Sequence, residues 1–211
     1  MKISWLAFMI VATFAACSNE GKGKENNAIA TDSISKSEPV TADSASEYLP
    51  VKSMLAGDLK EIETYGAAIL LRSKSGNKTD SAYIKVPQLL TLAQHFFPGE
   101  LEPELFTKHF KESSMMDQAT GSTTFLYTTE SQTSVLRKVI VYVSPGHALD
   151  KVSRIYMEKQ ELRGDTTITQ RLTWKLKEYF IIAESKEGPA GLQTASIKKA
   201  IWEPNLFGEE F

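Results

Sequence analysis

Downstream of residue 46, apolar residues recur at helical spacing in three places. One predicted helix carries an apolar stripe made of Val51, Leu55, Leu59 and Ile62. A second helix is predicted to begin at Pro87, because proline is tolerated at the first helical position, and to end before Pro98-Gly99. A third, short helix is predicted near Pro103, and its apolar side consists of Leu105, Phe106 and Phe110.

Strand-like segments lie between the first two helices and throughout the last third of the chain. Residues 67–71 and 81–86 are predicted to pair around the turn 75–78. After Gly121 the alternation has a period of two, with predicted strands at 125–127, 139–143, 152–157, 168–176, 179–183 and 195–202. Tight connections favour antiparallel pairing. The prediction is an α+β fold, with amino-terminal helices packed on an antiparallel meander of about six strands that could curl on itself.

One predicted strand is apolar on both sides. Leu136, Ile140 and Tyr142 lie opposite Val139 and Val141 in the alternation, so both faces of this strand should be covered. The helices can cover one face. Three ways of covering the other remain open: a packed core made by the sheet curling on itself, a cavity for an apolar ligand, or an interface with a partner or a second copy.

Composition separates the chain into a tether and a domain. Residues 18–46 are rich in Ser, Asn, Lys, Glu, Gly and Thr and cannot bury enough apolar surface to fold, so a disordered tether is expected. Residues 47–211 fit one domain by length. The net charge is −2, and no run of basic residues with interleaved aromatics occurs along the sequence. We therefore expect no nucleic-acid partner.

The amino terminus has the pattern of a secretory signal peptide at residues 1–16. Lys2 is followed by the apolar run Trp5–Ala16, which is shorter than the roughly 20 residues that span a bilayer. The closing tetrapeptide, Phe14-Ala15-Ala16-Cys17, resembles the lipobox of bacterial lipoproteins, although Phe14 stands where leucine is usual.

The resemblance implies cleavage before Cys17 and a membrane anchor attached to its sulfur, which removes the only thiol of the chain. In such lipoproteins an aspartate after the cysteine retains the protein in the inner membrane. Here Ser18 follows, which implies the outer membrane of the cell envelope, with the periplasmic or outward-facing side left open. The layout of anchor, tether and domain is similar to that of small envelope lipoproteins of Gram-negative bacteria.

Residues that could carry chemistry are few and scattered. His95, His109 and His147 have no metal-ligand spacing, and partly buried structural roles are expected for the first two. Three acidic residues crowd the connection before the third helix, and we interpret them as a solvated loop rather than a catalytic pair: Glu100, Glu102 and Glu104. No catalytic residue, metal site or cofactor is predicted.

The segment 113–121 is predicted to connect the last helix to the first strand of the meander. Its Met115 and Met116 are interpreted as capping the core, with an adaptable binding surface as the alternative. Together, these patterns predict a non-enzymatic binding or scaffolding module. It would be anchored to the membrane through the lipid on Cys17, with a protein partner or a homodimer. The alternative is a carrier or sensor of an apolar ligand in a half-barrel-like cavity.

Overall fold

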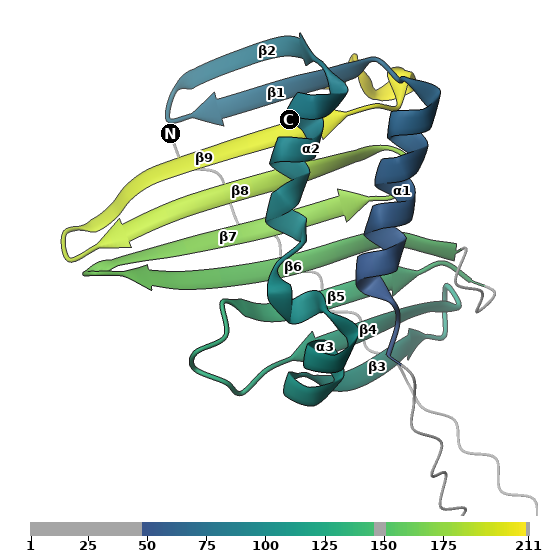
Figure 1. Ribbon diagram of the computed structural model, residues 1–211, viewed down its shortest axis with the longest axis vertical. Helices are drawn as coiled ribbons and strands as arrows, with labels where there is room; N and C mark the ends of the chain where they lie inside the picture. The colour runs from purple at the N-terminus through teal and green to yellow at the C-terminus, as the bar shows by residue number, and fades with distance from the viewer. Residues whose placement is uncertain (1–47, 146–150, 210–211) are drawn as a thin grey trace, which may run out of the picture. The chain divides into compact units, whose positions relative to one another are not determined.

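The computed structural model describes residues 48–145 and 151–209. The chain divides into the units Met1–Ser44 and Ala45–Phe211, and all described residues belong to the second (Figure 1). Its helices are α1 (Val51–Tyr65), α2 (Val86–Ala93) and α3 (Pro103–His109), with short 3-10 turns η1 (Gln94–Phe96), η2 (Gly99–Leu101) and η4 (Pro204–Leu206). Its strands are β1 (Ile69–Ser75), β2 (Lys78–Ile84), β3 (Lys111–Asp117), β4 (Ser122–Thr128), β5 (Leu136–Val143), β6 (Val152–Arg163), β7 (Thr166–Lys175), β8 (Tyr179–Gly188) and β9 (Gly191–Ile201).

All of these strands join one antiparallel sheet in the order β2-β1-β9-β8-β7-β6-β5-β4-β3. Strands β3 to β9 form a meander, and the last of them returns to pair with β1 of the early hairpin. The sheet is not closed, because β2 and β3 lie at opposite edges. The predicted combination of helices and an antiparallel sheet is confirmed.

The predicted number of about six strands is too low. The strands expected after Gly121 correspond to β4–β9. The predicted pair near residues 67–86 is the hairpin β1–β2, which belongs to the same sheet because Leu70 pairs with Ile201 of β9. The remaining strand, β3, occupies most of the segment expected as a connection, and it lacks an apolar alternation because both of its faces are largely exposed.

The three helices lie on one face of the sheet (Figure 1). The buried side of α1 consists of Val51, Leu55, Asp58 and Ile62, so the predicted apolar stripe does face the core. The helix ends at Gly66, whose φ of 62° is a left-handed conformation that glycine adopts at little cost. In α3, Phe106 is buried as predicted, whereas Leu105 is 43% exposed because this short helix turns it to solvent.

Aromatic side chains fill the space between the helices and the sheet. The ring of Phe96 lies edge-on to Trp174, with ring centroids 5.0 Å apart, and 5.2 Å from Phe180. Trp202 extends the cluster, 5.7 Å from Trp174. Phe96, Trp174 and Phe180 have no exposed surface, so this part of the interface is a packed core.

A buried carboxylate ties α1 to the turn between β7 and β8. Asp58 Oδ2 accepts a hydrogen bond from Trp174 Nε1 at 2.6 Å, and Lys177 N donates to Oδ1 at 3.0 Å. Lys177 has a φ of 68°, so the carboxylate holds a residue in the left-handed region. Burial raises the pKa of Asp58 above its ordinary value, against the lowering effect of these hydrogen bonds.

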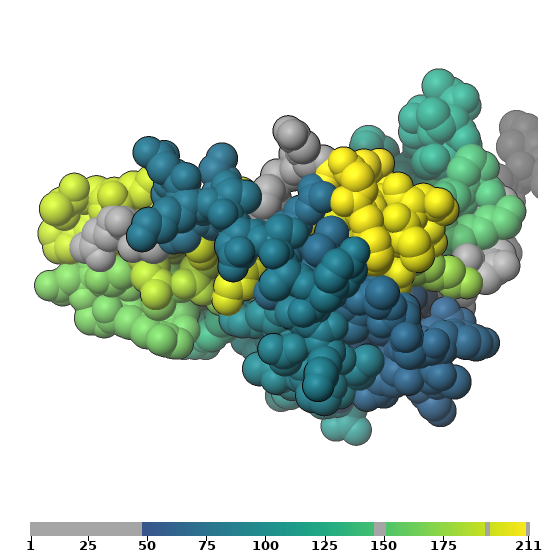
Figure 2. Space-filling view, turned by 90° about the horizontal axis from the view of Figure 1, so that it is seen from above, coloured from purple at the N-terminus to yellow at the C-terminus, as the bar shows by residue number. Residues whose placement is uncertain are grey.

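The second face of the sheet, called the open face below, carries the side chains that alternate with the core. Ile140 and Tyr142 lie there as predicted and are partly buried. Leu136 does not, because a β-bulge between Leu136 and Lys138 shifts the alternation and places Leu136 in the core with no exposed surface. The C-terminal segment, yellow in Figure 2, lies on the side of the strands away from α2, where Arg72 donates to the carbonyl oxygen of Phe207 at 2.6 Å.

Candidate functional site

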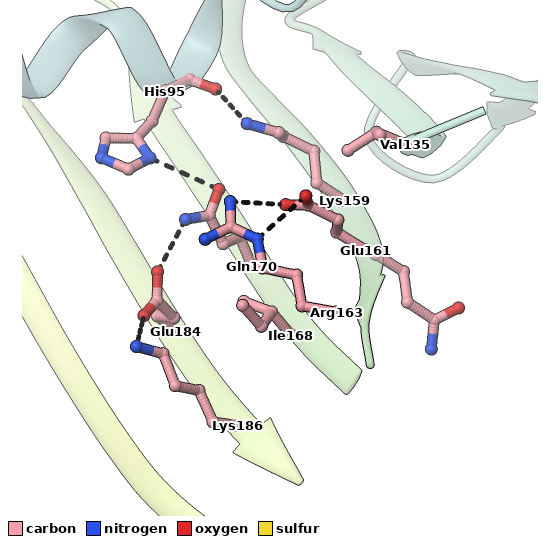
Figure 3. A pocket seen from close by; sticks show the side chains of 10 residues that line it. His95, Val135, Lys159, Glu161, Arg163, Ile168, Gln170, Glu184 and Lys186 are labelled. Atoms are coloured by element: carbon pink, nitrogen blue, oxygen red, sulfur yellow. Dashed lines mark hydrogen bonds and ion pairs between the residues drawn. The ribbon is translucent and has the colours of Figure 1, made fainter. Parts of the chain in front are cut away.

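A polar pocket lies on the helical side, where β6, β7 and β8 extend beyond the end of η1 (Figure 3). The volume of the pocket is about 350 Å³. The core residues of these strands give way here to polar side chains, because no helix covers this part of the sheet. The lining consists of His95, Val135, Lys159, Gln160, Glu161, Arg163, Ile168, Gln170, Glu184 and Lys186.

A chain of hydrogen bonds crosses this pocket from the helix to β8 (Figure 3). His95 Nδ1 lies 3.4 Å from Gln170 Oε1, and Gln170 Nε2 donates to Glu184 Oε2 at 2.7 Å. Lys186 Nζ lies 3.4 Å from the other oxygen of Glu184. The Gln170 hydrogen bond, followed by the neighbouring positive charges, lowers the pKa of Glu184. Because the Gln170 amide oxygen can only accept, a hydrogen bond between these two groups requires a proton on His95 Nδ1.

The other charges of the pocket are also satisfied locally. Arg163 forms two hydrogen bonds of 2.9 Å to the carboxylate of Glu161. Lys159 Nζ donates to the carbonyl oxygen of His95 at 3.2 Å, and burial lowers the pKa of this lysine. None of the described lining residues is a serine, threonine or cysteine that could act as a nucleophile. The arrangement can hold a small polar molecule, but its charges largely neutralise one another.

The open face has a different charge balance. Its alternating positions carry more basic than acidic residues: Arg72, Lys74, Lys111, Lys138, Arg154, Arg171, Lys175 and Lys199 against Asp117, Glu158 and Glu187. Four tyrosines lie among them: Tyr83, Tyr142, Tyr156 and Tyr179. No run along the sequence shows this, because the basic and aromatic residues come from different strands and only the sheet brings them onto one face.

The strand registers arrange the open face in rows that run across the sheet. An apolar row crosses β4, β5, β6 and β8 and consists of Leu126, Ile140, Tyr156 and Ile181, all partly buried. A charged row lies on each side of it. One contains Lys138, Glu158 and Arg171, and the other contains Arg154 and Lys175 between two tyrosines.

A groove of about 330 Å³ follows the second of these charged rows. Its lining is Ser122, Thr123, Thr124, Tyr142, Val143, Ser144, Ser153, Arg154, Lys175 and Tyr179. The guanidinium of Arg154 lies 4.1 Å from the ring centroid of Tyr142. Lys199 Nζ lies 4.7 Å from that of Tyr179, although only 6% of Lys199 is exposed.

The three glutamates before α3 do not converge. Glu100 accepts hydrogen bonds from the backbone N–H groups of Val135 and Leu136, at 2.9 and 3.3 Å, and so holds the loop before β5. Partial burial would raise the pKa of Glu100, but these hydrogen bonds together lower it. Glu102 pairs with Lys52, and Glu104 is exposed in the first turn of α3. Glu100 is thus an anchor for a loop rather than one more solvated residue.

The remaining candidates differ in part from expectation. His95 is partly buried, as predicted, and borders the polar pocket, but His109 is exposed in the last turn of α3. Met115 and Met116 are 70% and 52% exposed on the edge strand β3, so their predicted role as caps of the core is wrong. Cys17 and His147 lie outside the described residues.

Within residues 48–145 and 151–209, no helix is long and apolar enough to cross a membrane. The same residues contain no group of histidine, cysteine and acidic side chains that could hold a metal ion. Comparisons with protein-family models, with curated proteins and with solved structures found no match to this chain.

Proposed function

We propose that this chain is a lipid-anchored protein of the bacterial cell envelope, and that its domain is a non-enzymatic binding or scaffolding module. The binding surface is the open face of the sheet. The observation that carries the proposal is the arrangement of this face in rows, with an apolar row between two charged rows.

This pattern is the one that protein interfaces use. An apolar centre with a polar, charged rim is typical of interfaces, and tyrosine and arginine are enriched in them. Tyr156 lies in the apolar row, and Tyr142 and Arg154 lie at its rim. Helices α1, α2 and α3 all lie on the other face of the sheet, so they leave the open face to a partner.

The anchor is the second part of the proposal. It rests on the apolar run Trp5–Ala16 and on Cys17 at the end of the lipobox-like tetrapeptide, with Ser18 favouring the outer membrane. A protein held in this way fractionates with membranes, whereas Cys17→Ser should release it into the soluble fraction and abolish labelling by radioactive palmitate. A Cys17→Ser protein that still fractionates with membranes would contradict the anchor.

The alternative, a carrier or sensor of an apolar ligand in a half-barrel-like cavity, has less support. The helical side of the sheet is filled by a packed core, in which Phe96, Trp174 and Phe180 make mutual ring contacts, so such a cavity would have to lie on the open face. There the apolar row is flanked by a charged row on each side, and the groove is lined by Arg154 and Lys175. This surface suits a protein partner better than an apolar ligand.

Site-specific photo-crosslinking tests the binding surface in the cells that produce the protein. A benzophenone amino acid at Thr173, between Tyr156 and Ile181 on the open face, should give a covalent adduct of defined mass. The same amino acid at Glu63, exposed on α1, is the matched control and should give none. An adduct of twice the chain mass would identify the partner as a second copy. Equal adducts at both positions, or none at Thr173, would refute the proposal.

A further inference from the structure

The groove on the open face contains an arrangement of charges that the fold itself does not require. We propose that it binds a phosphate group between Arg154 and Lys175. This inference rests on the proposed binding role of the open face and names the chemistry of one ligand.

The registers of four neighbouring strands place the relevant side chains in one line. Tyr142 of β5 pairs with Arg154 of β6, Arg154 pairs with Lys175 of β7, and Lys175 pairs with Tyr179 of β8. All four side chains therefore project from the same face, as directly opposed neighbours. All four also line the groove of about 330 Å³. Two positive charges thus lie side by side between two aromatic rings.

Such a pair of like charges destabilises the sheet, because directly opposed cross-strand residues are close together. The other charged row avoids this cost. There Glu158 stands between Lys138 and Arg171 in the register, and Lys138 Nζ lies 3.5 Å from its carboxylate. In the groove, Glu178 approaches Lys175 from the following turn at 2.8 Å, but Arg154 has no carboxylate partner among the described residues. An anion between the two cations would relieve their repulsion.

The geometry of Arg154 suits an oxyanion. Its guanidinium is held over Tyr142 at 4.1 Å by a cation–π contact, so the side chain is positioned before a ligand arrives. A guanidinium can donate two parallel hydrogen bonds to a phosphate, and a lysine ammonium supplies a second charge.

The size of the groove limits the rest of the ligand. A volume of about 330 Å³ is at the small end of ligand pockets, which accommodates a phosphate together with a small polar group such as glycerol. Glycerol phosphate is also the headgroup of an anionic phospholipid, so the same chemistry is present in solution and at a bilayer.

Titration of the isotope-labelled chain from Ser18 onward with inorganic phosphate, followed by amide chemical shifts at constant ionic strength, tests the site. We expect saturable shifts at residues 142, 154, 175 and 179. Arg154→Gln and Lys175→Gln should each weaken binding by about tenfold or more, since a hydrogen bond to a charged group is lost. The matched variants Lys138→Gln and Arg171→Gln remove equal charge from the other row and should bind within about twofold of the parent.

A stability measurement separates this role from a structural one. Without phosphate, Arg154→Gln should unfold at a urea concentration close to that of the parent, because the loss of a repulsion offsets the loss of the cation–π contact with Tyr142. Shifts that do not saturate, equal weakening by all four variants, or strong destabilisation by Arg154→Gln would each overturn the proposal.

Two further comparisons complete the test. The first identifies the source of the phosphate, and the second distinguishes failure of the phosphate site from failure of the proposed function. Competition by phosphatidylglycerol vesicles, but not by phosphatidylcholine vesicles, would assign a lipid headgroup, and saturation by inorganic phosphate without competition would assign a soluble phosphate. If the phosphate titration fails while the Thr173 adduct still forms, the phosphate site is refuted and the binding module stands. If the phosphate titration fails and the Thr173 adduct is also absent, the phosphate site and the proposed binding module are both refuted.

Discussion

Removal of the Asp58 carboxylate should be among the most damaging single changes in this domain. Asp58→Ala leaves two donors without their acceptor, the Trp174 indole N–H and the Lys177 backbone N–H. Each hydrogen bond to a charged group contributes about 1.5–3 kcal/mol, so the gross loss is roughly 3–6 kcal/mol. Part of this loss is offset, because the variant no longer buries a carboxylate, and we expect a net loss of about 2–4 kcal/mol. Domains are stable by only about 5–15 kcal/mol, so the effect is large.

Urea denaturation followed by tryptophan fluorescence measures this loss. With a slope of about 2 kcal/mol per molar urea, the midpoint should fall by roughly 1–2 M. Glu63→Ala, an exposed change on the same helix, is the control and should stay within about 0.5 kcal/mol. An Asp58→Ala variant as stable as Glu63→Ala would refute the structural role of this carboxylate.

The pH dependence gives a second check on Asp58. Its pKa is raised in the native state, so the native protein holds the proton more tightly than the unfolded chain. The stabilising effect of this group is complete below 3.8 and is lost as the pH rises through the higher native pKa. The parent should therefore lose stability relative to Asp58→Asn as the pH increases across this window. If the stability of the parent relative to Asp58→Asn stayed constant or increased as the pH rises, this result would contradict the assigned burial.

Three further changes should separate anchored from exposed positions. Glu100→Ala should lower the free energy of unfolding by about 1–2 kcal/mol at pH 7 and accelerate amide exchange at Val135 and Leu136. Because the pKa of Glu100 is lowered in the native state, this loss should disappear as the pH falls below 4.5 and through the native pKa, and a loss that does not depend on pH would contradict the hydrogen bonds. Lys177→Gly should raise the free energy of unfolding by about 1 kcal/mol while Lys177→Ala should not, since only glycine relieves the left-handed φ of 68°. Peroxide should oxidise Met115 and Met116 well before the buried Met157, as mass spectrometry of peptides would show, and equal rates would contradict the exposed edge.

The elements that the sequence could predict are those in which one face is buried and the other is not. The apolar stripe of α1 and the alternation around Leu172 and Trp174 correctly predicted a helix and a central strand. Burial of one face selects apolar residues at the spacing of each element, which makes such elements visible in the sequence. Strand β3 was not predictable in this way. Its segment Lys111–Asp117 is an exposed edge, so nothing selects apolar residues on either side.

Two other features depend on contacts that a linear pattern does not contain. The bulge after Leu136 inverts the alternation within a strand, which is why that residue was expected on the wrong face. The pairing of β1 with β9 joins residues more than a hundred positions apart, as in Leu70 and Ile201. Such a pairing enlarges the sheet without leaving a local signal.

The candidate groove was missed for the same reason. Tyr142, Arg154, Lys175 and Tyr179 are spread over four strands, and only the registers bring them into one row. In the sequence each of them is an ordinary polar position between core residues. The signal that could have found them is the excess of basic residues at outward positions of β7 and β9, but it requires the correct assignment of faces.

Cysteine protection in living cells tests most directly whether the open face is occupied. Arg171→Cys places a thiol at an exposed position of that face, and Glu63→Cys places one on α1. Both should react with a maleimide in the purified chain from Ser18 onward. In the cells that produce the protein, we expect Arg171→Cys to be protected while Glu63→Cys reacts at its solution rate. Equal reaction at both positions in the cell would contradict the claim that a partner covers the open face.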